Sequence, residues 1–319
     1  AVESLDRALS GEELADRLEG VHLLGVRSKT RVSAEHLRDA DSLLAIGAFC
    51  IGTDQIDLSA ASEQGVAVFN APYSNTRSVV ELALAEIIAL TRGMVEKNRL
   101  MHEGVWDKSA AGAHEVRGRT LGIVGYGNIG AQLSVLAEAL GMNVYFYDTV
   151  DKLALGNARR CASLDELLAL ADVVTLHVDG RKGNAGLFGE RQFAAMKRGA
   201  LFLNLSRGFV IDTAALRNHL ASGHVAGAAV DVFPDEPSSR AEEFRNELRG
   251  APNVILTPHI GGSTQEAQQD IGRFVAGKLI DFGAAGSTIL SVNLPQLSLS
   301  DHPGTHRLAH LHQNVPGVL

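Results

Sequence analysis

The sequence predicts an α/β protein with two doubly wound parallel sheets, one domain being inserted into the other. Short apolar runs alternate with helical segments along most of the 319 residues, and this alternation is typical of parallel strands joined by helices. A glycine-rich strand–helix turn begins only at Gly125. Because a dinucleotide-binding domain normally opens with such a turn, the regular segments before it predict a second, discontinuous domain.

The segments before the glycine turn switch repeatedly between helical and strand patterns. In chain order we expect a helix at 12–18, a strand at 21–26, a helix at 34–38, strands at 42–46 and 66–69, and a helix between these two at 58–64. Residues 79–101 keep apolar positions at helical spacing without a proline, which predicts one long helix.

A second series follows the long helix. Strands are expected at 120–124, 143–147, 172–178, 200–205, 225–230 and 254–257, with the clearest helices at 129–140, 164–170, 213–221 and 264–282. We therefore assign 1–74 and 263–292 to the discontinuous domain and 75–262 to the dinucleotide-binding domain. Residues 293–319 contain Pro295, Pro303, Gly304 and a His-rich stretch, and they are assigned to a linker and the start of another domain.

Composition excludes several classes of function. The chain is 45% hydrophobic, its net charge is −8, and no basic patch interrupts the mixed charges, which argues against nucleic-acid binding. The apolar stretch 79–90 contains Glu81 and Glu86, so it does not predict a membrane span. Cys50 and Cys161 form no CxxC pair, which predicts no metal site and fits a reducing cytoplasm. A small-molecule substrate is the expected partner.

The glycine turn has the sequence Gly125-Tyr126-Gly127-Asn128-Ile129-Gly130 and follows an apolar run. Backbone N–H groups and a helix N-terminus at such a turn can bind a pyrophosphate, and a Cβ at its glycines would obstruct the turn. Asp148 ends the next apolar run. Its carboxylate can bind the ribose hydroxyls of NAD and would repel the 2′-phosphate of NADP, so NAD is the expected cofactor.

Three side chains that suit acid binding and proton transfer follow later strands. Arg207 follows the strand at 200–205, and its planar guanidinium suits a carboxylate. His259 follows the strand at 254–257, and its imidazole can accept a hydroxyl proton. Glu236 can orient that imidazole and favour its protonated form. Each alone could be an ordinary surface residue, but all three follow consecutive strands at one sheet edge, which predicts a dehydrogenase acting on a 2-hydroxy acid.

The chain resembles the D-isomer-specific 2-hydroxyacid dehydrogenases over nearly its whole length. The motifs that carry the resemblance are Gly47-Ala48-Phe49-Cys50-Ile51-Gly52-Thr53-Asp54, Phe69-Asn70-Ala71-Pro72-Tyr73-Ser74-Asn75-Thr76-Arg77-Ser78-Val79 and Thr257-Pro258-His259-Ile260-Gly261-Gly262-Ser263-Thr264-Gln265-Glu266-Ala267. The resemblance implies a Rossmann domain inserted into a flavodoxin-like substrate domain, with the reaction in the cleft between them.

The resemblance also implies which residues form the site. The catalytic set would be Arg207, Glu236 and His259. Around NAD, besides the turn glycines, Asp148 and His259, it places Asn128, Ile129, Leu205, Ser206, Arg207, Asp231, Gly261 and Gly262.

Within the family, the implied substrate is D-3-phosphoglycerate, oxidised with NAD, and 2-oxoglutarate reduction is a possible additional activity. The residues matched to this substrate are Arg27, Ser28, Lys29, Asn75 and Lys108. Paired cations fit a phosphate, which carries about two negative charges. A hydroxypyruvate or glyoxylate reductase, which would not need three such cations, and an NAD-sensing corepressor are the alternatives.

Both ends of the chain differ from the complete family pattern. The family's first strand and helix are expected to precede Ala1, and the chain has no initiator methionine. Residues 307–319 resemble the opening of an ACT regulatory domain, in which His312 and Asn314 match serine-binding positions. We therefore expect serine insensitivity. We also expect a homodimer through the NAD-binding domain near Trp106, and a tetramer only with a complete ACT domain.

Overall fold

The computed structural model describes residues 2–9, 11–237, 239, 241–298 and 312 of the chain. It divides into two compact units. The first comprises Ala1–Ser74 and Gln265–Leu319, and the second is the continuous segment Asn75–Thr264. Both units are α/β, with parallel pairing between all the named strands.

The first unit contains a three-stranded sheet in the order β1-β2-β3. Its elements are α1 (Gly11–Leu18), β1 (Leu23–Val26), α2 (Ala34–Arg38), β2 (Ala45–Ala48), α3 (Leu58–Glu63), β3 (Ala67–Phe69) and α10 (Gln265–Ala285). Leucines from the first two helices, Leu14, Leu18 and Leu37, pack with Val26 and Ile46 of the sheet.

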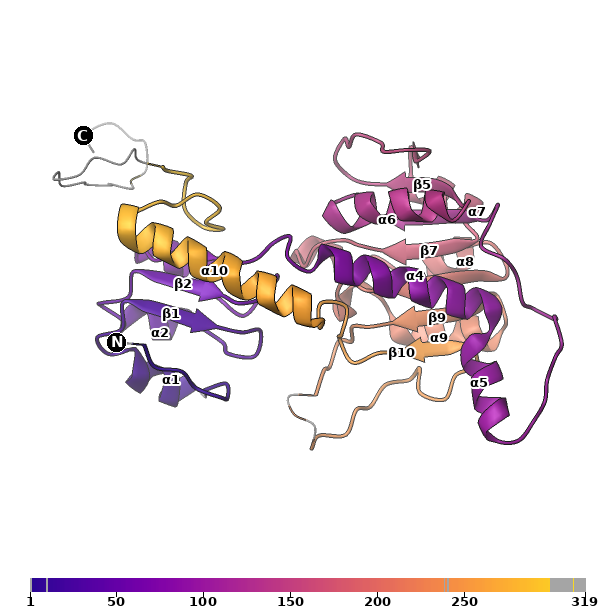
Figure 1. Cartoon of the computed structure of the whole chain (residues 1–319), viewed down its shortest axis with the longest axis horizontal. Coiled ribbons are helices and arrows are strands. Elements are labelled where there is room, and N and C mark those ends of the chain that lie inside the picture. The colour runs from indigo at the N-terminus through magenta and orange to yellow at the C-terminus, as the bar shows by residue number, and fades with distance from the viewer. Residues whose placement is uncertain (1, 10, 238, 240, 299–311, 313–319) are drawn as a thin grey trace. The chain divides into compact units, whose positions relative to one another are not determined.

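Helix α10 packs against β2 and β3 and completes this unit from the far end of the sequence (Figure 1). The close approach requires a glycine in β2, because a Cβ at Gly47 would lie 2.7 Å from Cγ1 of Val275 and 2.8 Å from Cδ1 of Leu279. Ile271 and Val275 are buried in this contact.

The second unit contains a seven-stranded sheet in the order β10-β9-β8-β7-β4-β5-β6. Its helices and strands are α4 (Thr76–Arg92), α5 (Met94–His102), β4 (Thr120–Val124), α6 (Asn128–Ala139), β5 (Asn143–Tyr147), β6 (Arg159–Arg160), α7 (Leu164–Leu170), β7 (Val173–Leu176), η1 (Lys182–Asn184), α8 (Glu190–Ala195), β8 (Ala200–Asn204), η2 (Gly208–Val210), α9 (Thr213–Ala221), β9 (Val225–Val230) and β10 (Val254–Leu256). The strand order reverses beside β4, and ligands bind at the carboxyl ends of strands at such a switch point.

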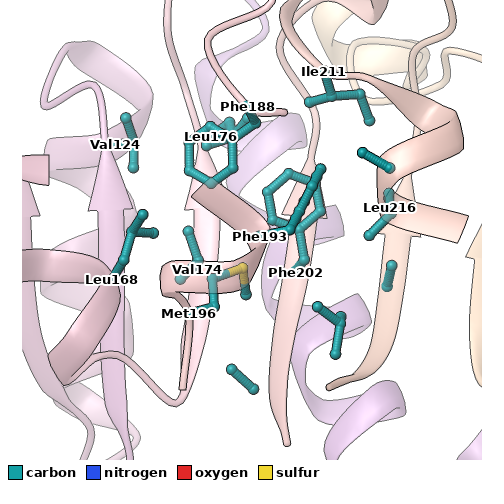
Figure 2. Packing of buried hydrophobic residues seen from close by; sticks show 14 of the residues in the cluster. Val124, Leu168, Val174, Leu176, Phe188, Phe193, Met196, Phe202, Ile211 and Leu216 are labelled. Atoms are coloured by element: carbon teal, nitrogen blue, oxygen red, sulfur yellow. The ribbon is translucent and has the colours of Figure 1, made fainter. Parts of the chain in front are cut away.

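Helices cover both faces of this sheet. Helices α4 and α6 pack on one face, where Ile87, Leu121 and Leu133 belong to one buried cluster. The other face is covered by α7, α8 and α9, and its cluster includes Phe188, Phe193 and Phe202 (Figure 2). The rings of Phe193 and Phe202 meet edge to face at a centroid distance of 5.1 Å. The buried faces keep the strands in register, and the strand ends are consequently fixed in position.

Several expected elements differ from the observed ones. The prediction of one long helix at 79–101 was wrong. Helix α4 ends and α5 begins at Gly93, whose left-handed backbone (φ 59°) terminates the first helix. The expected strand at 42–46 lies instead at Ala45–Ala48, where small residues make room for α10. Strand β6 and helix α8 were not expected, since Arg159 and Arg160 have no strand pattern and α8 has only six residues.

Among the residues that the structure describes, no helix combines the length and apolar content needed to cross a membrane.

Candidate active site

The glycine turn joins the carboxyl end of β4 to the start of α6. Gly125 has a left-handed backbone (φ 92°), and a Cβ there would lie 2.6 Å from the carbonyl oxygen of His177. At Gly130 a Cβ would lie 2.4 Å from the carbonyl oxygen of Gly125. By contrast, nothing lies within 4 Å of a Cβ built on Gly127, the N-cap of α6. The turn therefore leaves exposed backbone at a helix N-terminus, which fits a pyrophosphate.

Asp148 lies beside this turn, just after β5. Its Oδ2 accepts the backbone N–H of Tyr126 at 2.8 Å, and its Oδ1 accepts that of Val150 at 2.9 Å. These two bonds hold the carboxylate against the turn while other lone pairs on both oxygens stay available. The arrangement fits an adenosine ribose whose hydroxyls donate to Asp148.

The His259 imidazole and the Glu236 carboxylate form a close pair. His259 Nδ1 lies 2.9 Å from Oε2 of Glu236 and 3.0 Å from Oε1. The backbone N–H of Phe233 donates to the same carboxylate at 3.1 Å. Because Nδ1 is engaged with Glu236, Nε2 is the nitrogen that can exchange a proton with a substrate hydroxyl.

The loop carrying His259 is held by Asp231, which is 1% exposed at the end of β9. Its carboxylate accepts the N–H groups of Ile260 and Gly261, each at 2.8 Å, and its backbone oxygen accepts the N–H of His259 at 2.8 Å. The Thr257 hydroxyl donates to Oδ1 at 2.6 Å. These bonds maintain the left-handed backbone of His259 (φ 54°), which is unfavourable for a non-glycine residue.

The charges of the site shift its pKa values. The hydrogen bond that His259 donates to Glu236 raises the pKa of His259, against the opposing effect of burial, and the charges of Glu236 and Asp231 raise it further. Burial favours the neutral form of Glu236, but the hydrogen bond and charge of His259 outweigh this effect and lower its pKa. The imidazolium form is therefore stabilised beside an ionised carboxylate.

Arg207 lies between β8 and η2 and is half-buried. Its charge lowers the pKa of both Glu236 and His259, which places it in their electrostatic environment. Its backbone oxygen accepts from Nδ2 of Asn204 at 3.0 Å, and the Ser206 hydroxyl donates to Oδ1 of Asn204 at 2.8 Å. Asn204 thus holds the turn containing Leu205, Ser206 and Arg207. Sequence reasoning missed Asn204 and Thr257, although both are polar residues at the ends of apolar strands.

The remaining expected residues lie in different units. Arg27, Ser28 and Lys29 are exposed after β1 in the first unit, where Arg27 donates to Oε1 of Gln268 at 2.9 Å. In the second unit, Asn75 is the N-cap of α4 and Lys108 is exposed after α5.

The two ends of the second unit meet at the glycine pair. A Cβ on Gly262 would lie 2.6 Å from Nδ2 of Asn75, and one on Gly261 would lie 3.1 Å from Oδ2 of Asp231.

Of the expected serine-binding residues, His312 is exposed and Asn314 lies outside the described residues.

Comparison with known proteins identifies the family. Residues 84–261, which include the glycine turn and His259, match the model of the D-isomer specific 2-hydroxyacid dehydrogenase, NAD binding domain. The chain belongs to the D-isomer-specific 2-hydroxyacid dehydrogenase family. It is therefore an NAD-dependent enzyme.

Relatives in this family match nearly the whole chain. A Haemophilus influenzae protein named D-3-phosphoglycerate dehydrogenase is 54% identical over 98% of this chain and 76% of its own length. The Dictyostelium discoideum protein of the same name is 50% identical over 100% of this chain and 78% of its own. Among solved structures, the Aquifex aeolicus D-lactate dehydrogenase complexed with NAD and lactic acid has a TM-score of 0.79 at 27% identity, covering 88% of this chain and 90% of that one.

Replacing Glu236 is expected to change the pH dependence of this dehydrogenase. Oxidation of a 2-hydroxy acid needs neutral His259, so kcat/KM should rise with pH through the pKa of that residue. The Glu236→Gln variant loses the interaction that raises this pKa, so the rise should move to lower pH and the maximum should fall about tenfold or more.

Steady-state rates across pH measure both effects. The matched control is Glu190→Gln, which removes a carboxylate 2.9 Å from Nε2 of His219, a mostly buried histidine outside the site, and should leave the profile in place. An unshifted rise in the Glu236→Gln profile would contradict the coupling.

Cofactor selectivity is expected to depend on Asp148. A carboxylate facing the ribose disfavours a 2′-phosphate at short range, so the unmodified enzyme should prefer NAD. The Asp148→Ala variant should reduce the ratio of kcat/KM values for NAD and NADP by roughly tenfold or more. The control is Asp151→Ala at an exposed carboxylate paired with Arg160. Equal efficiency with both cofactors in the unmodified enzyme would refute the assignment.

Proposed function

We propose that this chain catalyses the NAD-dependent oxidation of D-3-phosphoglycerate to 3-phosphohydroxypyruvate, the first step of L-serine synthesis. The observation that carries the reaction class is the His259–Glu236 pair at 2.9 Å on the sheet edge that also bears Arg207. Relatives named D-3-phosphoglycerate dehydrogenase, 50–54% identical over nearly the whole chain, support the substrate.

Each side chain of the site has a defined task in this proposal. Arg207 binds the substrate carboxylate and the oxygen on C2 through its guanidinium. His259 accepts the C2 hydroxyl proton at Nε2, and Glu236 stabilises the imidazolium that results. NAD, held by the glycine turn and Asp148, supplies the acceptor for the hydride from C2. Asp231 and Asn204 keep the two loops of the site in place through the bonds described above.

The phosphate end of the substrate is assigned to a second group of residues, Arg27, Ser28, Lys29, Asn75 and Lys108. Arg27 and Lys29 are exposed cations two residues apart after β1. A phosphate with about two negative charges is stabilised by several cations and hydroxyls, whereas a non-phosphorylated 2-oxo acid does not require them.

Two substrates that differ only in the phosphate test this assignment. Reduction of 3-phosphohydroxypyruvate by Arg27→Ala should lose more than tenfold in kcat/KM, because a charge-assisted hydrogen bond contributes roughly 1.5–3 kcal/mol. Reduction of hydroxypyruvate by the same variant should be nearly unchanged. Arg31→Ala, at a nearby exposed arginine, is the control for a general loss of positive charge.

The same assay distinguishes the alternatives. His259→Asn should lose roughly 100- to 10,000-fold in rate with either substrate while still binding NAD. Hydroxypyruvate turned over as efficiently as its phosphorylated form would favour a hydroxypyruvate or glyoxylate reductase. Absence of turnover in the unmodified protein, with NAD bound, would favour an NAD-sensing protein.

We also propose that the enzyme is cytoplasmic and forms a homodimer through its NAD-binding unit. Both cysteines are free thiols, which fits a reducing compartment. Helix α5 buries none of its residues. Large apolar side chains on this helix and just after it are exposed to solvent: Met94, Val95, Met101, Val105 and Trp106. A cluster of this kind is typical of a protein–protein contact.

Substituting Trp106, which is 73% exposed, with a charged residue is expected to disrupt this dimer. Light scattering should give a dimer for the unmodified chain and a smaller weight-average mass for Trp106→Glu, because a buried unpaired carboxylate opposes association. Leu153→Glu, at another exposed apolar residue, should remain dimeric. A monomeric unmodified chain would exclude the proposed contact.

A further inference from the structure

Helix α4 buries a carboxyl group that the proposed mechanism does not use. Glu86 is 3% exposed, and it shares the inward face of the helix with Ala83, Ile87 and Leu90. Among the described residues, neither of its buried carboxyl oxygens has a hydrogen-bond partner. Since a buried carboxyl without partners is costly, its presence in an otherwise apolar helix face suggests a role.

Two polar residues of the active-site loops act on this carboxyl group. The charge of Asp231 reaches it from the end of β9, and the Thr257 hydroxyl lies near enough to affect it. Burial and the charge of Asp231 raise the pKa of Glu86 to about 8, against the opposing effect of the Thr257 hydroxyl. Burial thus favours the carboxylic acid form of Glu86, which has an O–H group to donate.

The hydrogen bond that Thr257 donates to Asp231 determines which group can donate to Thr257. The single hydroxyl proton of Thr257 is donated to Oδ1 of Asp231 at 2.6 Å. Thr257 can then only accept from Glu86, and the neutral acid can donate to it. Asp231 in turn accepts the N–H groups of the loop that carries His259.

We propose that Glu86, buried on the face of α4 that packs against β9 and β10, is a positioning residue of the active site, whose carboxyl group supports Thr257 and thereby holds Asp231 and the His259 loop in their active arrangement. Ionised Glu86 would lack the donor and would place a second negative charge beside Asp231, and the loop would loosen. This inference rests on the proposed role of His259 in proton transfer.

Other ionisable groups near α4 do not account for the state of Glu86. The helix packs against α5, α6, β8, β9 and β10. On α5, Glu96 and Arg99 are exposed and paired with each other, and half-buried Lys97 is paired with Asp107. On α6, Glu138 accepts the backbone N–H of Asn157. Asp231 is the charge that acts on the Glu86 carboxyl.

The inference is tested by the rate of D-3-phosphoglycerate oxidation between neutral and alkaline pH, in the full chain with NAD. In this direction His259 produces only a rise in rate with pH, so a fall above about 8 that is absent from a Glu86 variant reports the ionisation of Glu86. Glu86→Gln is neutral at every pH and can donate from its amide. It should keep a rate within about threefold of the unmodified enzyme at neutral pH and should lack the alkaline fall.

A second variant separates positioning from packing. Glu86→Met fills similar space without a donor, so its kcat should be about tenfold lower than that of Glu86→Gln at every pH, with little change in NAD affinity. Glu96→Gln on α5 is the control and should retain the alkaline fall. Equal kcat values for the Gln and Met variants, or an alkaline fall that persists in Glu86→Gln, would overturn the inference.

A spectroscopic measurement keeps the test independent of turnover. At neutral pH, the infrared difference spectrum between the unmodified protein and Glu86→Gln should contain a protonated carboxylic acid band, which should disappear above about pH 8. Absence of that band at neutral pH would overturn the inference even if the variants folded poorly. If the band is present while D-3-phosphoglycerate is not oxidised, the substrate assignment fails and the protonation state of Glu86 stands.

Discussion

The arrangement of the active-site loops depends on the Asp231 carboxylate. This side chain is buried at the end of β9, and its oxygens accept two backbone N–H groups and the Thr257 hydroxyl. The left-handed backbone conformation of His259 has an energetic cost, and these hydrogen bonds offset it. The His259–Glu236 pair depends on that conformation, because the imidazole must point toward a carboxylate that belongs to a different loop.

The parallel sheet explains why residues distant in sequence can form one site. Glu236 and His259 follow β9 and β10, Arg207 follows β8, and the glycine turn follows β4, all at carboxyl ends. The buried clusters on the two faces hold these strands in register. The conformational cost of ordering the site is thus offset by packing elsewhere, and polar groups such as Asn204 need only fix the last residues of each loop.

Sequence reasoning was most successful where a local pattern determines the structure. The glycine turn and the alternation of strands and helices follow from backbone sterics and periodicity, so the α/β class was correctly predicted. The break at Gly93 was missed because the apolar spacing continues across it. Asn204, Thr257 and Glu86 could not be assigned roles, since their significance comes from partners that only the tertiary structure brings together. The roles of Arg207, Glu236 and His259 remain predictions that rest on chemistry and resemblance.

The contact between Gly47 and α10 has a consequence for the order in which the protein is made. During synthesis β2 leaves the ribosome before the second unit, but Val275 and Leu279, which cover it, leave only after that unit. The second unit is continuous in sequence, so its core can close first, since domains generally fold as units while the chain grows. The apolar surface of the first sheet therefore stays uncovered while the second unit is being made, and during that time it is open to aggregation and chaperone binding at residues that are buried in the folded enzyme.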